Sequence, residues 1–258
     1  MAPKGASGRN HRSGLTVEGR RPVLEALRSE VTVQRILMFE ELERGPQIEE
    51  IIRLARAAAI PIEPARTRDL DRASATGKHQ GVIALTPDPH YVPLDRLLID
   101  ASAGDDAPLI AVLDGIEDPQ NLGAIARTVD CAGGHGLVIP ERRAAGITPG
   151  AIRASAGALE HVPVARVVNL GRAVEEIKSA GVWTVGLDAD AGQDYTQVDL
   201  TGPTAIVIGA EGSGLSRLVR EKCDLLASIP LLGKLESLNV SVSAAIALYE
   251  AVRQRRNV

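Results

Sequence analysis

Short apolar runs alternate with amphipathic stretches over the second half of the chain. Six runs rich in Val, Ile, Leu and Ala have the length of buried strands, at residues 109–113, 136–139, 162–167, 182–187, 204–208 and 228–231. Apolar residues at helical spacing separate most of these runs, at residues 122–132, 151–158, 171–180 and 215–223. Strands that are apolar on both faces and alternate with helices predict an α/β fold whose mostly parallel sheet is covered by helices on both faces.

The first part of the chain has a smaller α/β pattern. It predicts helices at 21–29 and 47–59 and strands at 33–39, near 62 and at 82–85. Residues 86–108 are rich in Pro, Asp, Gly and Ser, with one short helical stretch at 94–99, which is typical of a linker. We therefore expect four regions: a disordered basic tail (1–14), a small N-terminal α/β domain (15–88), a linker (89–107) and a larger C-terminal domain (108–258).

The last helical stretch, residues 237–249, is apolar nearly all round, which predicts burial of most of its surface. Four short polar side chains lie at its start: Ser237, Asn239, Ser241 and Ser243. One of them can act as an N-cap for the first free backbone N–H groups. Four are more than a cap uses, so the alternative is that some of them line a ligand pocket. The local pattern leaves both interpretations open.

Two loops between strand and helix are candidate sites. In the first, Asn121 precedes a helix on which Arg127 lies beside the small residues Gly123 and Ala124, so that its guanidinium could approach a ligand or remain an ordinary surface group. The second, residues 208–215, is rich in glycine, and strand ends and helix starts converge at such loops. Its glycine spacing differs from the dinucleotide-binding fingerprint. Glu211 at its centre disfavours a phosphate and favours a cationic or neutral polar ligand.

Composition narrows the function classes. Residues 1–90 carry 14 Lys and Arg against 12 Asp and Glu, whereas the whole chain has a net charge of −4, so cations are relatively enriched in the N-terminal part. With five aromatic side chains among 258 residues, a single-strand binder that works by stacking is disfavoured.

No apolar run approaches the roughly 20 residues of a membrane span, and the N-terminus does not resemble a signal peptide, so we expect a cytoplasmic protein without a membrane partner. Cys131 and Cys223 lack metal-ligand spacing and are predicted to be buried free thiols.

Three motifs occur in order along the second half: Asn121-Leu-Gly-Ala-Ile-Ala-Arg127, then residues 208–215, then Ile229-Pro-Leu231 followed by Ser237-Leu-Asn-Val-Ser-Val-Ser243. Together they resemble the signature motifs of the SpoU (TrmH-like) RNA ribose 2′-O-methyltransferases. The resemblance implies a C-terminal domain threaded into a trefoil knot, S-adenosylmethionine bound at the knot as methyl donor, and a homodimer in which both subunits contribute groups to each site.

The resemblance also implies roles for individual residues. Gly209, Ile229, Leu231 and Leu238 match positions whose backbone surrounds the cofactor. The catalytic set corresponds to Asn121, Arg127, Glu211, Ser237 and Asn239, with no metal. We assign Arg127 to phosphate positioning and alkoxide stabilisation, because a guanidinium stays protonated and is a poor base. Since the 2′-hydroxyl distinguishes RNA from DNA, the chemistry excludes a DNA substrate.

The N-terminal domain resembles the substrate-binding domain of the branch that methylates a guanosine of 23S rRNA, through residues 17–27 and 79–83. We therefore expect rRNA as the partner and the 23S guanosine as the target. A tRNA ribose methyltransferase and a non-catalytic RNA-binding assembly factor with the same fold are the alternatives. A nucleotide-dependent oxidoreductase is disfavoured by the glycine spacing of residues 208–215.

Overall fold

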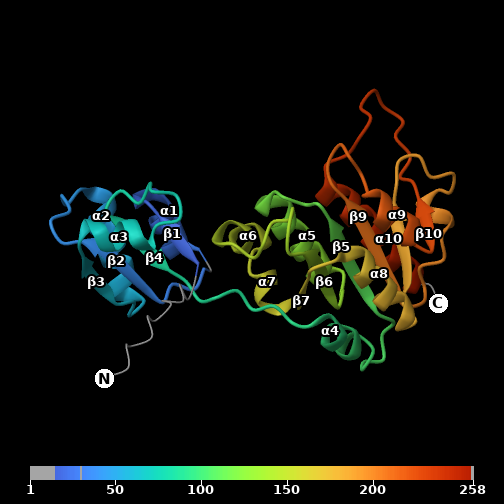
Figure 1. Cartoon of the computed structure of the whole chain (residues 1–258), viewed down its shortest axis with the longest axis horizontal. Coiled ribbons are helices and arrows are strands. Elements are labelled where there is room, and N and C mark those ends of the chain that lie inside the picture. Colours follow the sequence, from blue (N-terminus) through green and yellow to red (C-terminus); the bar gives the residue numbers. More distant parts are fainter. Residues whose placement is uncertain (1–14, 30, 257–258) are drawn as a thin grey trace, which may run out of the picture. The chain divides into compact units, whose positions relative to one another are not determined.

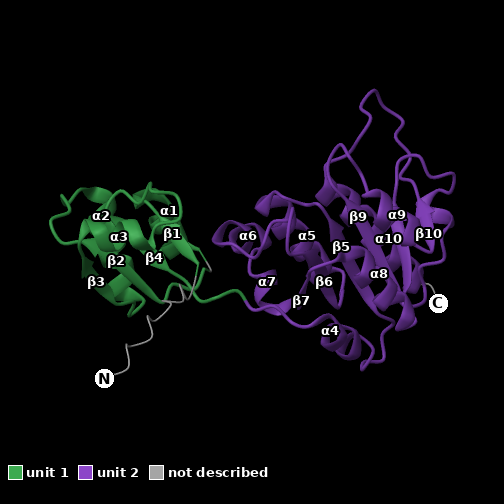
Figure 2. Cartoon of the chain, in the orientation of Figure 1, with its two compact units in different colours: residues 1–89 green, residues 90–258 purple. Residues whose placement is uncertain are grey.

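The computed structural model describes residues 15–29 and 31–256, and the chain divides into two compact units, residues 1–89 and 90–258 (Figure 2). The tail predicted at residues 1–14 lies outside the described residues. Each unit is described by itself below.

Within its described residues, the first unit contains one four-stranded sheet in the order β1-β4-β2-β3 (Figure 1). Its elements are β1 (Thr16–Glu18), α1 (Arg20–Arg28), β2 (Arg35–Phe39), α2 (Pro46–Ala57), β3 (Ile62–Ala65), α3 (Thr67–Ala73) and β4 (Val82–Leu85). Strand β2 is parallel to β3 and antiparallel to β4, which is antiparallel to β1. The predicted helices and strands are present. The sequence pattern did not predict β1 or α3, because neither is long enough to display a period.

The larger unit contains a six-stranded sheet, counted over the part of the chain that the structure describes, in the order β10-β8-β9-β5-β6-β7. All its pairings are parallel. The strands are β5 (Leu109–Asp114), β6 (Gly136–Pro140), β7 (Val164–Val167), β8 (Trp183–Leu187), β9 (Thr204–Gly209) and β10 (Leu225–Ala227). The strand expected at 228–231 was wrong. Strand β10 ends at Ala227, Ser228 forms only an isolated bridge with Asp194, and Pro230 has no N–H to continue the ladder.

Helices cover both faces of this sheet, as predicted (Figure 1). They are α4 (Leu94–Ala101), α5 (Pro119–Cys131), α6 (Pro149–Ser155), α7 (Ala158–His161), α8 (Leu170–Ser179), the 3₁₀ turn η1 (Tyr195–Gln197), α9 (Arg217–Lys222) and α10 (Val240–Arg255). Side chains of α5, α6 and α10 share one hydrophobic core, and those of α4, α8 and α9 share the other. The trefoil knot stays a prediction.

Most of the stretch expected to be a linker belongs to the second unit. Val92 bridges Ala165 beside β7, and Leu94, Leu97 and Leu98 of α4 are buried in the core below that strand. The short helical stretch predicted at 94–99 is present as α4, but the polar composition of the flanking residues did not indicate that it packs into a core. The unit therefore begins at residue 90.

The predicted burial of the last helix is confirmed for most of its residues, whereas the predicted burial of Cys131 was wrong. Helix α10 buries Ala244, Leu248 and their neighbours but leaves Val242 45% and Tyr249 48% exposed. Cys131, at the end of α5, is exposed, whereas Cys223 is partly buried. None of the described helices has the length and apolar character needed to cross a membrane.

Candidate active site

Parallel strands end at one edge of the second unit's sheet, and this edge carries the candidate site. Strands β10, β8, β9 and β5 are neighbours, so the loops that follow them converge. The loop after β9 forms a tight turn in which Ala210 and Gly214 exchange backbone hydrogen bonds of 3.0 and 2.9 Å. Asp114, at the end of β5, accepts a 2.7 Å hydrogen bond from the backbone N–H of Ser216 and so fixes the far end of this turn.

Gly209 is required by the packing of that turn. A Cβ atom at this position would lie 2.1 Å from the Gly214 carbonyl carbon and 2.3 Å from the Leu215 nitrogen. Gly212 and Gly214 have φ values of 81° and 65°, which are strained for residues with a side chain. The glycines therefore allow the chain to fold back against the end of β9.

Asn121 and Asn239 meet at the start of two helices, although 118 positions separate them in sequence. The Asn239 Nδ2 donates a 3.1 Å hydrogen bond to the Asn121 Oδ1. Its Oδ1 accepts hydrogen bonds from the Ser241 backbone N–H (2.9 Å) and hydroxyl (2.6 Å), so Asn239 caps α10. Asn121 is not a cap, because Asp118 caps α5 by accepting from the Gln120 N–H. Of the two roles left open by the sequence, Asn239 therefore has that of the helix cap, and its side chain also orients Asn121.

A cavity of about 190 Å³ opens at this edge, between the loops that follow β8, β9 and β10. Six of the nine residues predicted for the site line it: Gly209, Glu211, Ile229, Leu231, Ser237 and Leu238. A neighbouring cavity of about 770 Å³ shares several of these residues and extends along residues 229–238. Asn121, Arg127 and Asn239 line neither cavity.

The segment 229–238 has free backbone groups. It contains no strand or helix, and within residues 15–29 and 31–256 its backbone neither donates nor accepts a hydrogen bond. Its side chains are also exposed: Leu232 is 98% and Leu235 is 80% accessible. An exposed apolar segment with free N–H and C=O groups is suited to contact another molecule.

Carboxylates surround the cavity. Asp188, which follows β8, lines it and is paired with Arg220; this hydrogen bond and charge raise the pKa of Arg220. Glu211 and Glu236 are exposed and form no ion pair with any described residue. The local charge therefore favours a cationic ligand. Among the described residues, no group of three or more His, Cys, Asp or Glu side chains is arranged to hold a metal ion.

Arg127 is on α5 but is separate from the cluster. It is exposed and has no partner among the described residues. Six residues of α-helix place it about 9 Å along the axis from Asn121 and about 120° around it. Helix α5 does approach its neighbour closely, since a Cβ at Gly123 would lie 2.5 Å from the Ala151 carbonyl oxygen of α6.

Sequence reasoning missed Asp114, Asp188 and Glu236. Asp114 and Asp188 are the first polar residues at the ends of buried strands, and the rule that ligands bind at strand carboxyl ends would have selected both. Glu236 lies in an irregular segment without a comparable signal.

Comparisons with known proteins identify the family of this chain. The family model described as "SpoU rRNA Methylase family" matches residues 108–249, and the model described as "RNA 2′-O ribose methyltransferase substrate binding" matches residues 16–92. The Bacillus subtilis protein YacO, named as a TrmH family tRNA/rRNA methyltransferase, is 45% identical over 94% of this chain and 96% of its own. An uncharacterized tRNA/rRNA methyltransferase of Mycolicibacterium vanbaalenii is 44% identical over 99% of this chain and 82% of its own.

Solved structures are similar over both units. The SpoU methyltransferase AviRb from Streptomyces viridochromogenes, in complex with the cofactor AdoMet, superposes with a TM-score of 0.64. It is 31% identical, and the match covers 98% of this chain and 96% of AviRb. Taken with the glycine turn, the paired asparagines and the acidic cavity at the sheet edge, these matches show that the chain belongs to the SpoU rRNA methylase family and is an S-adenosylmethionine-dependent RNA methyltransferase.

Proposed function

We propose that this protein transfers the methyl group of S-adenosylmethionine to a ribose 2′-hydroxyl in structured RNA, and that its target is a guanosine of 23S rRNA. The observation that carries the proposal is the single cavity lined by Gly209, Ile229, Leu231 and Leu238 together with Glu211 and Ser237. The match of residues 16–92 to the 2′-O ribose substrate-binding model supports the ribose oxygen as the acceptor.

The residues around the cavity fit the cofactor. Gly209 leaves the turn after β9 open to close backbone approach, and the apolar side chains of Ile229, Leu231 and Leu238 can pack against the adenine ring. Free backbone groups of 229–238 can bind the polar edge of that ring. The carboxylates Glu211 and Glu236, unpaired within the described part of the chain, match the positive charge of the sulfonium and the amino group. When bound, S-adenosylmethionine supplies a methyl group that its cationic sulfur already activates.

This chain's residues then position the acceptor hydroxyl. An in-line methyl transfer requires an oriented oxygen and exclusion of water, without a covalent nucleophile. Ser237 and Asn239 hold the 2′-oxygen by hydrogen bonds, and Asn239 has a fixed orientation because Ser241 and Asn121 engage both ends of its amide.

Arg127 reaches the site from a second copy of the chain. In one chain it faces away from Asn121, whereas a homodimer formed through the exposed apolar residues Leu232, Leu235, Val242 and Tyr249 would cover an unpartnered surface. In this arrangement Arg127 of one copy binds a phosphate beside the target ribose and stabilises the developing alkoxide at the other copy's cavity.

Subunit complementation tests this arrangement. Arg127→Ala and Asn239→Ala are each expected to abolish methyl transfer. A mixed dimer, purified through two different affinity tags, should regain about half of the wild-type rate, since one of its two sites then has both native residues. An inactive mixed dimer would place both residues in the same chain's site, and an active Arg127→Ala homodimer would remove Arg127 from the mechanism.

The substrate is tested by methyl incorporation into total RNA from a strain that lacks the protein, with 2′-O-methyl sites mapped by their resistance to alkaline cleavage. The expected result is label at a single guanosine of 23S rRNA. Label confined to tRNA would support the proposed methyl transfer but show that the substrate is tRNA and not 23S rRNA. Cofactor binding without transfer to any RNA would favour an assembly factor.

A further inference from the structure

The first unit contains a cavity of about 530 Å³, and all of its lining residues belong to that unit. Its apolar floor is formed by Phe39, Leu42 and Leu70, and its polar rim includes Arg20, Thr67 and Gln80. Pockets of roughly 300–1,000 Å³ are typical of small-ligand sites. The size and the division into floor and rim therefore suit one flat, polar-edged group.

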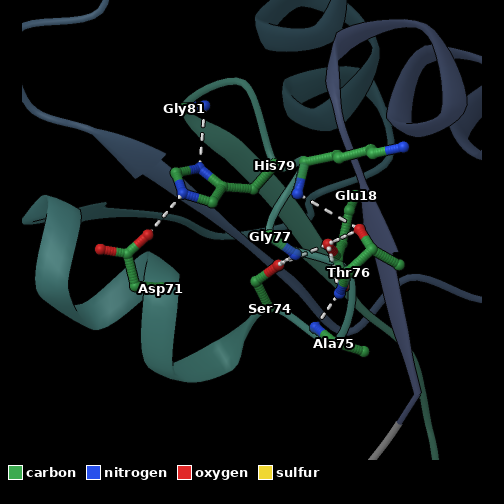
Figure 3. A network of polar contacts seen from close by, with 9 residues as sticks. Glu18, Asp71, Ser74, Ala75, Thr76, Gly77, His79 and Gly81 are labelled. Carbon is green, nitrogen blue, oxygen red and sulfur yellow. Dashed lines mark hydrogen bonds and ion pairs between the residues drawn. The ribbon is translucent and has the colours of Figure 1, made fainter.

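The loop that borders this cavity, residues 74–81, is held by Glu18 of β1 (Figure 3). The Glu18 carboxylate accepts hydrogen bonds from the Ser74 hydroxyl (2.5 Å), the Thr76 hydroxyl (2.6 Å) and the Ala75 backbone N–H (2.5 Å). Burial by itself raises the pKa of Glu18, but these hydrogen bonds outweigh it and lower the pKa to about 2. Glu18 is thus a charged anchor that keeps the loop in one conformation.

His79 is fixed within the same loop (Figure 3). Its side chain is 13% exposed, and its Nδ1 accepts a 3.0 Å hydrogen bond from the Gly81 N–H. Its Nε2 lies 3.1 Å from the Asp71 carboxylate, so the ring proton is on Nε2 and points to Asp71. The Gln80 Oε1 accepts from the Arg20 backbone N–H at 3.2 Å, which leaves the Gln80 amide NH₂ available. The rim is therefore organised before any ligand arrives.

Two cations lack partners among the described residues: Arg20, which lines the cavity, and Lys78, which lies in the bordering loop next to the lining residue His79. The Arg20 guanidinium and the Lys78 ammonium form no ion pair or hydrogen bond with any residue of the described ranges. The carboxylates nearby are already engaged: the loop surrounds Glu18, and His79 faces Asp71. The unmatched charge at this rim is positive.

We infer that this cavity binds one unpaired nucleotide of the RNA substrate. The base lies on the Phe39 floor, its edge meets the Thr67 hydroxyl and the Gln80 amide, and the flanking phosphates contact Arg20 and Lys78. Unpaired bases can leave the helical stack and lie against an aromatic ring, whereas paired bases cannot enter such a cavity. Phe39 is the one aromatic residue among the described residues that line the cavity, which suits a single nucleotide, whereas the scarcity of aromatic side chains disfavours stacking along a whole single strand. The inference rests on the proposed function, because it requires an RNA substrate. It adds a second RNA-binding site, in the first unit, to the methyl-transfer site of the second unit.

Binding of RNA oligonucleotides to the full chain tests the inference. The probes are a fluorescent 12-nucleotide single strand and the corresponding 12-base-pair RNA duplex, measured by fluorescence anisotropy. The single strand should bind more tightly. Arg20→Gln should weaken its binding about tenfold or more, which corresponds to the loss of one charged hydrogen bond. Thr67→Val, which leaves the charge unchanged, should weaken it severalfold.

Arg21→Gln is the matched control. It is the next residue of α1, carries the same charge, and is already paired with Glu25 at 3.0 Å. We expect less than a twofold effect, because Arg21 does not line the cavity. Equal losses for Arg20→Gln and Arg21→Gln would show diffuse attraction to the helix and would overturn the inference, as would equal binding of duplex and single strand. Unchanged thermal unfolding of each variant establishes that the fold is intact.

Photocrosslinking locates the base directly. A 4-thiouridine in the single strand should crosslink to peptides that contain Phe39 or residues 79–81, and Arg20→Gln should reduce the yield. Crosslinks elsewhere in the first unit, with none at the cavity, would overturn the inference. Methyl transfer is measured separately with wild-type protein. Transfer without crosslinking at the cavity would contradict this inference and leave the proposed function intact. Crosslinking at the cavity without transfer to any RNA would contradict the proposed function and leave this inference intact.

Discussion

Replacement of Glu18 by Gln should loosen the loop at residues 74–78. Glu18 has a pKa of about 2, compared with an ordinary value of 4.5. This difference corresponds to about 3.4 kcal/mol, and solvent screening of a partly exposed group reduces it to roughly 2 kcal/mol. Gln keeps the shape of the side chain but replaces one acceptor oxygen with a donor and removes the charge. The amides of Ala75 and Thr76, which donate to Glu18, should therefore exchange with solvent about 30-fold faster at pH 7.

Amide hydrogen exchange of wild type and variant at a series of pH values measures this effect. Because the folded pKa of Glu18 is lowered, its stabilisation is fully present above pH 4.5 and is lost as the pH falls toward 2. The ratio of exchange rates should accordingly shrink over that window. Glu25→Gln, the same substitution at an exposed ion pair, should leave the loop unchanged. A ratio below about threefold at pH 7, or one that does not depend on pH, would refute the role of Glu18 as a charged anchor.

Three further results are expected. Gly209→Ala should abolish detectable S-adenosylmethionine binding in calorimetry and lower the free energy of unfolding by about 1–3 kcal/mol, because the new methyl group overlaps the backbone of its own turn, whereas Gly192→Ala, in open space, should bind normally. Arg255→Lys should lower the free energy of unfolding by about 2 kcal/mol in urea titration, since this guanidinium donates to four backbone carbonyls that an ammonium cannot reach together; an unchanged midpoint would contradict this reading. Burial raises the pKa of Cys223 to about 12, so iodoacetamide at pH 8 should modify the exposed Cys131 and spare Cys223, and equal modification in peptide mass spectra would show that Cys223 is accessible.

The sequence predicts the second unit's sheet well because most of its strands are buried on both faces. Residues 109–113 are apolar throughout and residues 204–208 are apolar after Thr204, and both runs are strands whose residues are all buried. Short elements depend on contacts that no local pattern contains. Strand β1 is three residues long and exists because Val17 pairs with Ala84 of β4. The strand predicted at 228–231 was wrong for the same reason: strand pairing depends on contacts with distant residues, and an apolar run does not show where that pairing ends.

The candidate site can be predicted from the sequence where it depends on a local motif, and not where it depends on contacts between distant segments. The glycine turn at 209–214 could be recognised from its loop position, and it is where expected. The hydrogen bond between Asn121 and Asn239 joins residues 118 positions apart, and no periodic pattern in the sequence predicts it. Arg127 was placed with the catalytic set by resemblance, and within one chain it lies outside both cavities.

The strand order of the second unit also constrains how the chain is made. Its central pair joins β5 to β9, with Leu109 opposite Thr204, whereas the first unit's sheet is complete once residue 85 has been synthesised. On the ribosome the first unit can fold early, but β5 waits for about 95 further residues before its partner emerges. During that interval a strand with five consecutive apolar residues, 109–113, is unpaired on one side. Nascent chains truncated between residues 114 and 204 should therefore bind chaperones, and that binding should cease when β9 is released.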